Sequence, residues 1–174
     1  MEIYVPDSYQ ESILTINYES LKNKGIKYLL FDLDNTIIPQ NKKSVPDNIK
    51  ELFNKLKEDF QIILFSNSPK KRVSMIANEL GIAYIYLAFK PSPKKFFDVM
   101  KSYKCSENEM AIIGDQIVTD IKGGNRVGIF SILVNPISKY DPLWTKIGRK
   151  REKRIIKKLR QKDLFLGRFY DEKV

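Results

Sequence analysis

Histidine is absent from this 174-residue sequence, and cysteine occurs once, as Cys105. Without histidine the chain cannot build a Ser-His-Asp or Cys-His nucleophile, most zinc sites or a phosphohistidine. Ala111 lies six positions after Cys105, where a cysteine phosphatase loop would place arginine. A lone cysteine cannot form an intrachain disulfide, which favours a reducing compartment. Any catalysis must therefore use carboxylates, hydroxyls, lysines and a hard cation.

Glycine-rich phosphate loops and long apolar runs are also missing. Neither GxxxxGK[ST] nor GxGxxG occurs, which excludes the common nucleotide-binding loops. The longest apolar run, residues 82–89, is well short of the roughly 18 residues that span a bilayer. The N-terminus, Met1-Glu2-Ile3-Tyr4, lacks the basic start and apolar core of a signal peptide. We expect a soluble, cytoplasmic protein.

What the sequence does contain is enough apolar material for one folded domain and an uneven charge. The hydrophobic content is 43%, which supports a globular fold with a sizeable core. The net charge is +10, and residues 145–174 carry 12 Lys and Arg against 4 Asp and Glu. We therefore expect a nearly neutral domain over residues 1–142 and a basic helical tail over residues 143–174.

Apolar segments alternate with amphipathic segments along the domain. Strands are predicted at residues 27–33, 60–65, 83–87, 110–113 and 128–134, and helices at 46–57, 70–80, 93–103 and 117–126. Wholly apolar strands that alternate with helices indicate right-handed βαβ units. The prediction is an α/β fold with a doubly wound, parallel, five-stranded sheet and helices on both faces, within a core of residues 26–136. Residues 1–25 are expected to add a short helix or two that ends at Gly25.

Two carboxylates, Asp32 and Asp34, stand where the first predicted strand stops. Side chains alternate along an extended chain, so both would point the same way. Two like charges that close repel unless a cation lies between them or one is protonated. A plain polar turn is the alternative, because Asp and Asn are common turn formers.

Polar side chains also follow three of the other predicted strands. Ser66 ends the second, Lys90 follows the third, and Asp115 follows the fourth, with Asp120 five residues further on. Open α/β sheets bind their ligands at this carboxyl edge. Taken singly, Ser66 fits a helix N-cap and Lys90 a solvated lysine. Taken together, these residues predict one crevice that holds acids, a hydroxyl and an ammonium group.

In order and spacing these segments resemble the four motifs of the haloacid dehalogenase-like (HAD) phosphatases. The DxDx[TV] motif matches residues 32–36, the second-strand serine matches Ser66, the third-motif lysine matches Lys90, and GDxxxxD matches residues 114–120. The wording FDLDNT, SNS and GDQxxTD, the Pro-Asp start at residues 6–7 and the basic C-terminal region are similar to the YqeG group of HAD subfamily IIIA. Relatives of that group include phosphatidylglycerophosphate phosphatases of mitochondria and photosynthetic organisms.

The resemblance implies an aspartyl-phosphate mechanism. Asp32 would be the nucleophile, and Asp34 would protonate the leaving oxygen and then deprotonate the attacking water. Mg²⁺ would be held by the Asp32 carboxylate, the Asp34 carbonyl and Asp115. The cation would also relieve the repulsion between the two aspartates.

The resemblance also implies roles for the remaining motif residues. Thr36, Ser66 and Asn67 would contact the phosphoryl group, and Lys90 would balance the packed negative charge. Asp120 would anchor a metal-bound water or Lys90 rather than bind Mg²⁺ directly.

Two other aspartate-based sites fit the sequence less well. A calcium-binding EF-hand loop that began at Asp32 would need glycine at position 37 and glutamate at position 43, where the chain has Ile37 and Lys43. A phosphate-receiver domain also uses aspartates, a hydroxyl and a lysine on a parallel sheet. It would not need the Asp32-x-Asp34 pair or the Gly-Asp turn at residues 114–115.

Cap domains, which enclose the substrate in many HAD enzymes, have no room in this chain. One helix fills the segment between Thr36 and the second strand, and one helix and one strand separate Ser66 from Lys90. Without a lid, the site is open to water and to bulky substrates. This favours a phosphate carried on a lipid, a protein or a nucleic-acid end.

The basic tail has three interpretations. Aliphatic residues at 143, 147, 155 and 159 form one stripe of a helix that is otherwise basic. Such a helix can lie on an anionic membrane, dock on its own domain with a solvated charged face, or bind RNA or the ribosome. Aromatic residues are not interleaved in the basic run, so stacking on bases is poorly supported.

The sequence thus predicts a Mg²⁺-dependent HAD phosphomonoesterase with a large or lipid-borne substrate, phosphatidylglycerophosphate being the leading candidate. A phosphatase of protein or nucleic-acid ends is an alternative. A second alternative is a basic RNA- or ribosome-binding protein on a HAD scaffold. The protein is expected in the cytoplasm, with peripheral contact to the inner face of the membrane if the tail binds lipid.

Overall fold

A computed structural model of the protein describes residues 1–138 and 143–162, and in the last helix it describes side chains from residue 152 onward. The strands are β1 (Ser8–Gln10), β2 (Tyr28–Phe31), β3 (Gln61–Phe65), β4 (Ala83–Ile85), β5 (Met110–Gly114) and β6 (Phe130–Val134). The α-helices are α1 (Tyr18–Asn23), α2 (Asp47–Leu56), α3 (Lys70–Leu80), α4 (Lys94–Tyr103), α5 (Lys122–Val127) and α6 (Leu143–Gln161). The described residues also form short 3₁₀ turns, η1 (Glu2–Tyr4) and η2 (Glu107–Glu109), and a π-helical turn, η3 (Ile117–Ile121).

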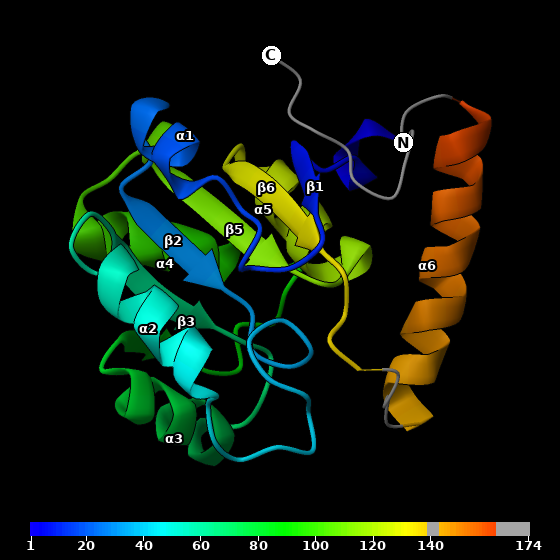
Figure 1. Ribbon diagram of the computed structural model, residues 1–174. Helices are drawn as coiled ribbons and strands as arrows, with labels where there is room; N and C mark the ends of the chain where they lie inside the picture. Colours follow the sequence, from blue (N-terminus) through cyan, green and yellow to red (C-terminus); the bar gives the residue numbers. More distant parts are fainter. Residues whose placement is uncertain (139–142, 163–174) are drawn as a thin grey trace.

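All six strands are parallel and lie in the order β1-β6-β5-β2-β3-β4 (Figure 1). The chain runs outward from β2 through β3 to β4, then crosses back to β5 on the other side of β2. The winding therefore changes direction between β2 and β5, which is where open α/β sheets bind their ligands. The predicted α/β, doubly wound parallel sheet is confirmed.

The sheet separates two apolar layers, because alternate residues of each strand face opposite sides. Leu29 and Phe31 of β2 join one core with the buried faces of α1, α2 and α3. Leu30 of β2 joins the other core with Phe96 of α4 and Val127 of α5. Helices thus cover both faces, as the wholly apolar strands predict.

The prediction of five strands is wrong by one, and the error lies in residues 1–25. The sequence predicts only helix in this segment, but it contains β1, which pairs with residues 132–134 of β6, and the short helix α1. The strand is only Ser8-Tyr9-Gln10, and Ser8 alone of the three is buried. An edge strand this short and polar carries no apolar run that could reveal it in the sequence.

Two further boundaries differ from the sequence prediction. The strand predicted at 83–87 ends at Ile85, because Leu87 and Phe89 adopt left-handed backbone, with φ of 45° and 54°. The helix predicted at 117–126 is divided into η3 and α5. In η3 the side chain of Asp120 is buried at the sheet edge, where it belongs to the site described below.

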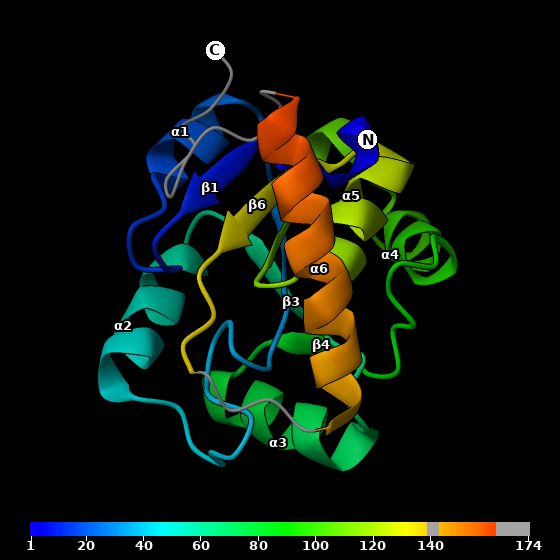
Figure 2. The ribbon, with the colours of Figure 1, turned by 90° about the vertical axis from the view of Figure 1, so that its right-hand side faces the viewer.

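The helix α6 runs along one side of the molecule, apart from the layers of the sheet (Figure 1), and crosses in front of β6 and α5 when seen from that side (Figure 2). Its Ile155 and Leu159 are buried in a third apolar cluster with Ile117 and Ile121 of η3 and Leu133 of β6. Two residues of the predicted aliphatic stripe therefore pack on the domain itself. Across residues 1–138 and 143–162, no helix combines the length and apolar character needed to cross a membrane.

Candidate active site

The strand register brings the predicted site residues to one edge of the sheet. Phe31 of β2 lies between Leu64 of β3 and Ile113 of β5, so the residues that follow these strands leave the sheet at nearly the same level. Most of the predicted site residues line a cavity of about 370 Å³, although Thr36, Asp115 and Asp120 lie outside its lining. Its lining comprises Asp32, Asp34, Asn35, Gln40, Ser66, Asn67, Ser68, Pro69, Lys90, Gln116 and Thr119.

At the base of this cavity Lys90 bridges two carboxylates. Its Nζ lies 2.7 Å from Oδ1 of Asp32 and 2.6 Å from Oδ1 of Asp120. All three side chains are buried. The lysine is thus not a solvated surface residue, because an ammonium group buried this deeply requires partners of opposite charge.

Burial and neighbouring charges raise the pKa of both Asp32 and Lys90, which disfavours the charged form of the acid and favours that of the base. Desolvation raises the pKa of Asp32 to about 7; Lys90 opposes the rise, and the charges of Asp120 and Asp34 add to it. Desolvation lowers the pKa of Lys90, but Asp120 and Asp32 outweigh it, and the pKa of Lys90 lies above its usual range. Lys90 therefore stays charged, while Asp32 holds its negative charge at a cost in free energy.

Asp115, the acid that follows β5, lies close to this pair. Asp32, Asp115 and Asp120 each offer a carboxylate oxygen within 4.8 Å of the others. Thr36 lies between the first two, with its Oγ1 3.4 Å from Oδ2 of Asp32 and 3.5 Å from Oδ1 of Asp115. Segments more than 75 residues apart in sequence, 32–36 and 115–120, thus meet at one point.

A divalent cation fits this donor set. Three buried carboxylates lie close together here, and the ammonium group of Lys90 contacts two of them, those of Asp32 and Asp120. Buried charge of one sign is costly unless it is paired or binds a metal. Carboxylate oxygens are the ligands that Mg²⁺ prefers.

The side chain of Asp34 is held by α3, a contact that the sequence motifs did not reveal. Ser68 donates a hydrogen bond to Oδ2 of Asp34, and Nε and Nη2 of Arg72 both lie 2.7 Å from Oδ1. Arg72 stands in the first turn of α3, six residues after Ser66. In the sequence it is one of three consecutive basic residues, so nothing but its helical spacing from Ser68 could have marked it.

Asn67 links the loops that follow β3 and β4. Its side-chain carbonyl accepts a 2.7 Å hydrogen bond from the backbone N–H of Lys90, and its amide donates to the carbonyl of Lys90 at 3.1 Å. Ser66 is buried beside it, and its Oγ accepts from the backbone N–H of Ser68. Both residues line the cavity, and their contact with a phosphoryl group stays a prediction.

The turn that carries Asp115 is fixed from two sides. The backbone N–H of Gln116 donates to Oδ2 of Asp120, and the backbone N–H of Ile117 donates to Oε1 of Glu152 in α6, at 2.6 Å. A Cβ atom on Gly114 would lie 2.3 Å from the carboxyl carbon of Asp120, so only glycine fits at that position. The glycine of the GD motif therefore makes room for the second acid of the motif.

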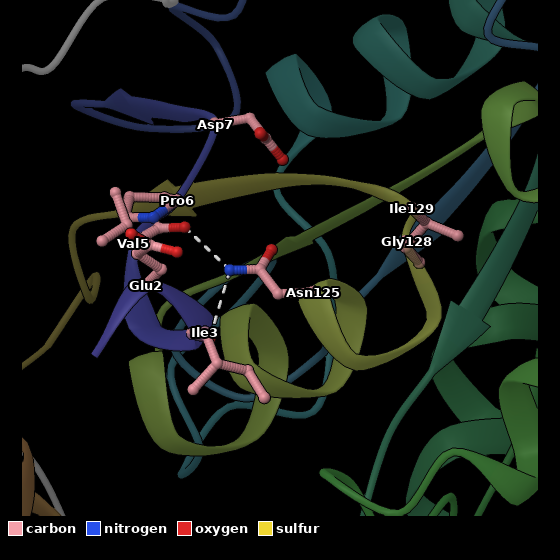
Figure 3. Close-up of a pocket in the computed structure, with 8 residues that line it drawn as sticks. All are labelled: Glu2, Ile3, Val5, Pro6, Asp7, Asn125, Gly128 and Ile129. Carbon is pink, nitrogen blue, oxygen red and sulfur yellow. Dashed lines mark hydrogen bonds between the residues drawn. The ribbon is translucent and has the colours of Figure 1, made fainter.

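A second, larger hollow of about 620 Å³ lies elsewhere, beside the N-terminal segment (Figure 3). Asn125 donates there to the carbonyls of Ile3 and Val5, and the carboxylate of Asp7 accepts from the N–H and hydroxyl of Ser131. Residues 128 and 129, which also line it, precede β6, so it opens at the amino edge of the sheet. Its polar groups hold β1 and β6 together and contribute nothing to the carboxyl-edge site.

The fold and the acidic cluster at the switch point define a HAD-type phosphatase, a phosphoric monoester hydrolase. Solved structures support the fold. A HAD-family enzyme of Bacteroides thetaiotaomicron in complex with magnesium has a TM-score of 0.54 and 15% identity, with 69% of this chain and 98% of that one covered. A cobalt-bound deoxy-D-mannose-octulosonate 8-phosphate phosphatase of Haemophilus influenzae has a TM-score of 0.53 and 18% identity, with 78% and 86% covered.

A family model described as mitochondrial PGP phosphatase matches residues 2–138, and the chain belongs to this family. It is 33% identical to the probable phosphatase YqeG of Bacillus subtilis (strain 168) over 92% of its own length and 94% of the relative. It is 26% identical to phosphatidylglycerophosphate phosphatase 1, chloroplastic/mitochondrial, of Arabidopsis thaliana, over 94% of its own length and 50% of that protein. The resemblance to the YqeG group seen in the motifs is confirmed.

Proposed function

We propose that this chain is a Mg²⁺-dependent phosphomonoesterase that works through an aspartyl-phosphate, with phosphatidylglycerophosphate as its substrate. The observation that carries the proposal is the position of Asp32: it is buried, ion-paired to Lys90, within reach of two further acids, and open to the cavity. A carboxylate held in this way is a nucleophile in a fixed orientation, which is what in-line attack on phosphorus requires.

In the first half of the reaction, an oxygen of Asp32 bonds to phosphorus while the bond from phosphorus to the substrate alcohol oxygen breaks. Asp34 acts as the general acid and gives a proton to the departing oxygen. In the second half, the Asp34 carboxylate takes a proton from water, whose oxygen attacks the phosphorus. The bond to Asp32 breaks, and inorganic phosphate leaves.

The other side chains position the phosphoryl group and balance its negative charge. Lys90 balances the charge of Asp32 and of the phosphoryl oxygens, and Ser66 and Thr36 offer hydroxyl groups close to them. Bound to the carboxylates of Asp32 and Asp115 and the carbonyl of Asp34, Mg²⁺ would supply positive charge that offsets the repulsion between the nucleophile and the phosphate. Asp120 would fix Lys90, consistent with the 2.6 Å contact between them.

The proposed substrate rests on two observations. The family and its plant and algal relatives are named for phosphatidylglycerophosphate. In addition, residues 32–60 contain one helix, α2, and residues 66–90 contain only α3 and β4, so nothing within residues 1–138 is inserted where a cap domain would enclose a small substrate. An open site admits the headgroup of a lipid, and within residues 1–138 no lid is present to enclose and select a small phosphate ester.

The alternative of a basic RNA- or ribosome-binding protein is set aside, because the chain belongs to a phosphatase family and has a complete acidic cluster. The proposed membrane contact of the tail loses two residues of its apolar stripe, since Ile155 and Leu159 are buried against the domain, and the side chains at 143 and 147 lie outside those described. The cytoplasmic location stays a prediction.

The test is phosphate release from phosphatidylglycerophosphate in vesicles and from nucleotide, sugar and peptide phosphates, each with Mg²⁺ and with a chelator. We expect Mg²⁺-dependent release that is highest for the lipid. Asp32→Asn keeps the shape of the side chain but removes the nucleophile, and should abolish release while the circular dichroism spectrum stays that of the wild type. Full activity of this variant would refute the assignment of the nucleophile.

A further inference from the structure

The loop that follows β4 exposes large apolar side chains directly beside the active site. Tyr86 is 38% exposed, Leu87 39% and Phe89 65%, whereas Ala88 between them is fully buried. The next residue is Lys90, which contacts Asp32. Three exposed large side chains within four consecutive residues form an apolar surface patch, and such patches mark interaction sites.

This loop is held in place at a cost in backbone free energy. Leu87 and Phe89 have positive φ, which is unfavourable for bulky residues. Backbone N–H groups of Leu87 and Ala88 donate to the carbonyls of Ser68 and Ser66, and Asn67 holds the backbone of Lys90. The loop is therefore a rigid extension of the site, and it presents Leu87 and Phe89 to solvent in a fixed orientation.

Beside the loop lies a hollow of about 380 Å³, lined largely by apolar side chains. Its lining comprises Tyr84, Ile85, Tyr86, Leu87, Phe89, Lys95, Asp98, Val99, Ser102 and Tyr103. Leu87 and Phe89 line this hollow, whereas Lys90 lines the catalytic cavity, so the loop separates the two.

The charge beside the loop is mainly positive, although Nζ of Lys95 lies 3.6 Å from Oδ2 of Asp98 and Lys90 is buried against Asp32. Residues 86–97 contain three lysines and no acidic residue. Lys94 is exposed, and Nζ of Lys70 lies 5.8 Å from the ring centroid of Tyr86. Phe97, in the first turn of α4, is a further exposed aromatic, at 53%. Apolar and aromatic side chains ringed by lysines complement a surface that is apolar below and anionic above.

We propose that the β4–α4 segment, residues 86–97, docks on an anionic lipid surface and so brings the cavity to a lipid-borne phosphate. The inference rests on the proposed function, and it assigns the membrane contact to this loop instead of the basic tail. Leu87 and Phe89 enter the boundary between headgroups and acyl chains, while Lys94 and Lys95 meet anionic headgroups. Because the loop is bonded to residues 66–68, a phosphate at the same surface lies next to the catalytic groups.

The experiment measures sedimentation of the full chain with vesicles of phosphatidylglycerol and, separately, of phosphatidylcholine. The test variant is Leu87→Asn/Phe89→Asn, because asparagine tolerates left-handed backbone better than most residues and preserves the loop while removing its apolar surface. The control is Leu14→Asn, which removes a side chain that is 50% exposed in the connection after β1, at the opposite end of the sheet from β4.

We expect wild type and control to bind phosphatidylglycerol vesicles with similar affinity. The affinity of the test variant should be lower by about tenfold or by a larger factor. Lys94→Glu/Lys95→Glu should weaken binding to a similar degree. The ratio of activity on vesicle-borne to water-soluble phosphomonoesters should fall with the affinity.

Several results would overturn the docking proposal: no sedimentation of the wild type, equal binding to phosphatidylcholine, unchanged binding of the test variant, or a wild-type dimer that the test variant converts to a monomer. The last would show that a second copy covers the loop. Vesicle binding that depends on the loop, without phosphate release from any substrate, would support docking and refute the proposed function.

Discussion

Arg72 holds the side chain of Asp34 with two nitrogens, Nε and Nη2, each 2.7 Å from Oδ1. The same guanidinium donates from Nη1 to the carbonyl of Lys42 at 2.7 Å and from Nη2 to the carbonyl of Pro39 at 3.3 Å. Arg72 thus connects α3, the loop after β2 and the proposed acid–base residue. Its geometry is that of a positioning residue, because a planar guanidinium fixes direction as well as charge.

Replacing Arg72 with alanine should lower kcat about 10- to 100-fold and leave KM nearly unchanged, because Asp34 loses its orientation while the groups proposed to contact phosphate stay in place. Steady-state kinetics on a soluble phosphomonoester measures both constants. Arg72→Lys should recover only part of the loss, since lysine supplies charge without the planar fork. Lys71→Ala, at the exposed neighbouring position, is the matched control. A pure rise in KM would contradict a positioning role.

The raised pKa of Asp32 should make the proposed binding of Mg²⁺ depend on pH. In a chelator, the stability that protonated Asp32 contributes is fully present below the ordinary pKa of 3.8 and is lost as the pH rises through about 7. Mg²⁺ requires the carboxylate, so the melting temperature should rise more on addition of Mg²⁺ at pH 8 than at pH 6. Differential scanning fluorimetry measures both shifts. In Asp32→Asn the difference between the two pH values should shrink; identical profiles for wild type and variant would contradict this account.

Gly114→Ala should destabilise the protein by about 3 kcal/mol, because the new Cβ would displace the buried carboxyl group of Asp120 from Lys90. Urea unfolding followed by fluorescence gives the free energy of unfolding. Gly25→Ala is an informative control. Its Cβ would meet nothing within 4 Å, so only the positive φ of 84° is penalised, and the expected loss is about 1 kcal/mol. Equal losses in the two variants would show that the clash is absorbed elsewhere.

Glu152→Ala should cost about 1–3 kcal/mol, since it leaves the buried N–H of Ile117 without the 2.6 Å acceptor that α6 supplies. Asp115 lies two residues before Ile117 in the same turn, so the affinity for Mg²⁺, measured by titration calorimetry, should fall as well. Glu152→Gln retains an acceptor and should recover most of the stability. Lys153→Ala, at the adjacent exposed position, controls for charge on the helix. Weaker Mg²⁺ binding in this control would argue for a general electrostatic effect.

The sequence predicts the central strands and the meeting of Asp32 with Asp115 because both follow from local signals. Wholly apolar runs mark buried parallel strands, and the residues after them must share an edge once the strands pair. β1 could not be found in this way, since Ser8-Tyr9-Gln10 is polar and its pairing with β6 lies more than 120 residues away. Its position depends on Asp7 and Ser131, a contact that no local pattern encodes.

The sequence also does not predict which side chains contact one another within the site. The motifs locate Asp34 but not Arg72, because a basic residue in a run of three looks like solvated charge until the helix is placed against the loop. For the tail, the stripe at residues 155 and 159 predicts an apolar face without saying what covers it. The packing of Ile155 and Leu159 on η3 and β6 answers that question, and it depends on surfaces formed only after folding.

The short strand β1 has a consequence for how the protein can be handled. It occupies the free edge of β6, and with only three residues it offers little template for another chain. A version that begins after residue 10 would leave the backbone of Ile132, Leu133 and Val134 unpaired at an open border. Such a protein would tend to recruit a strand from a neighbouring molecule.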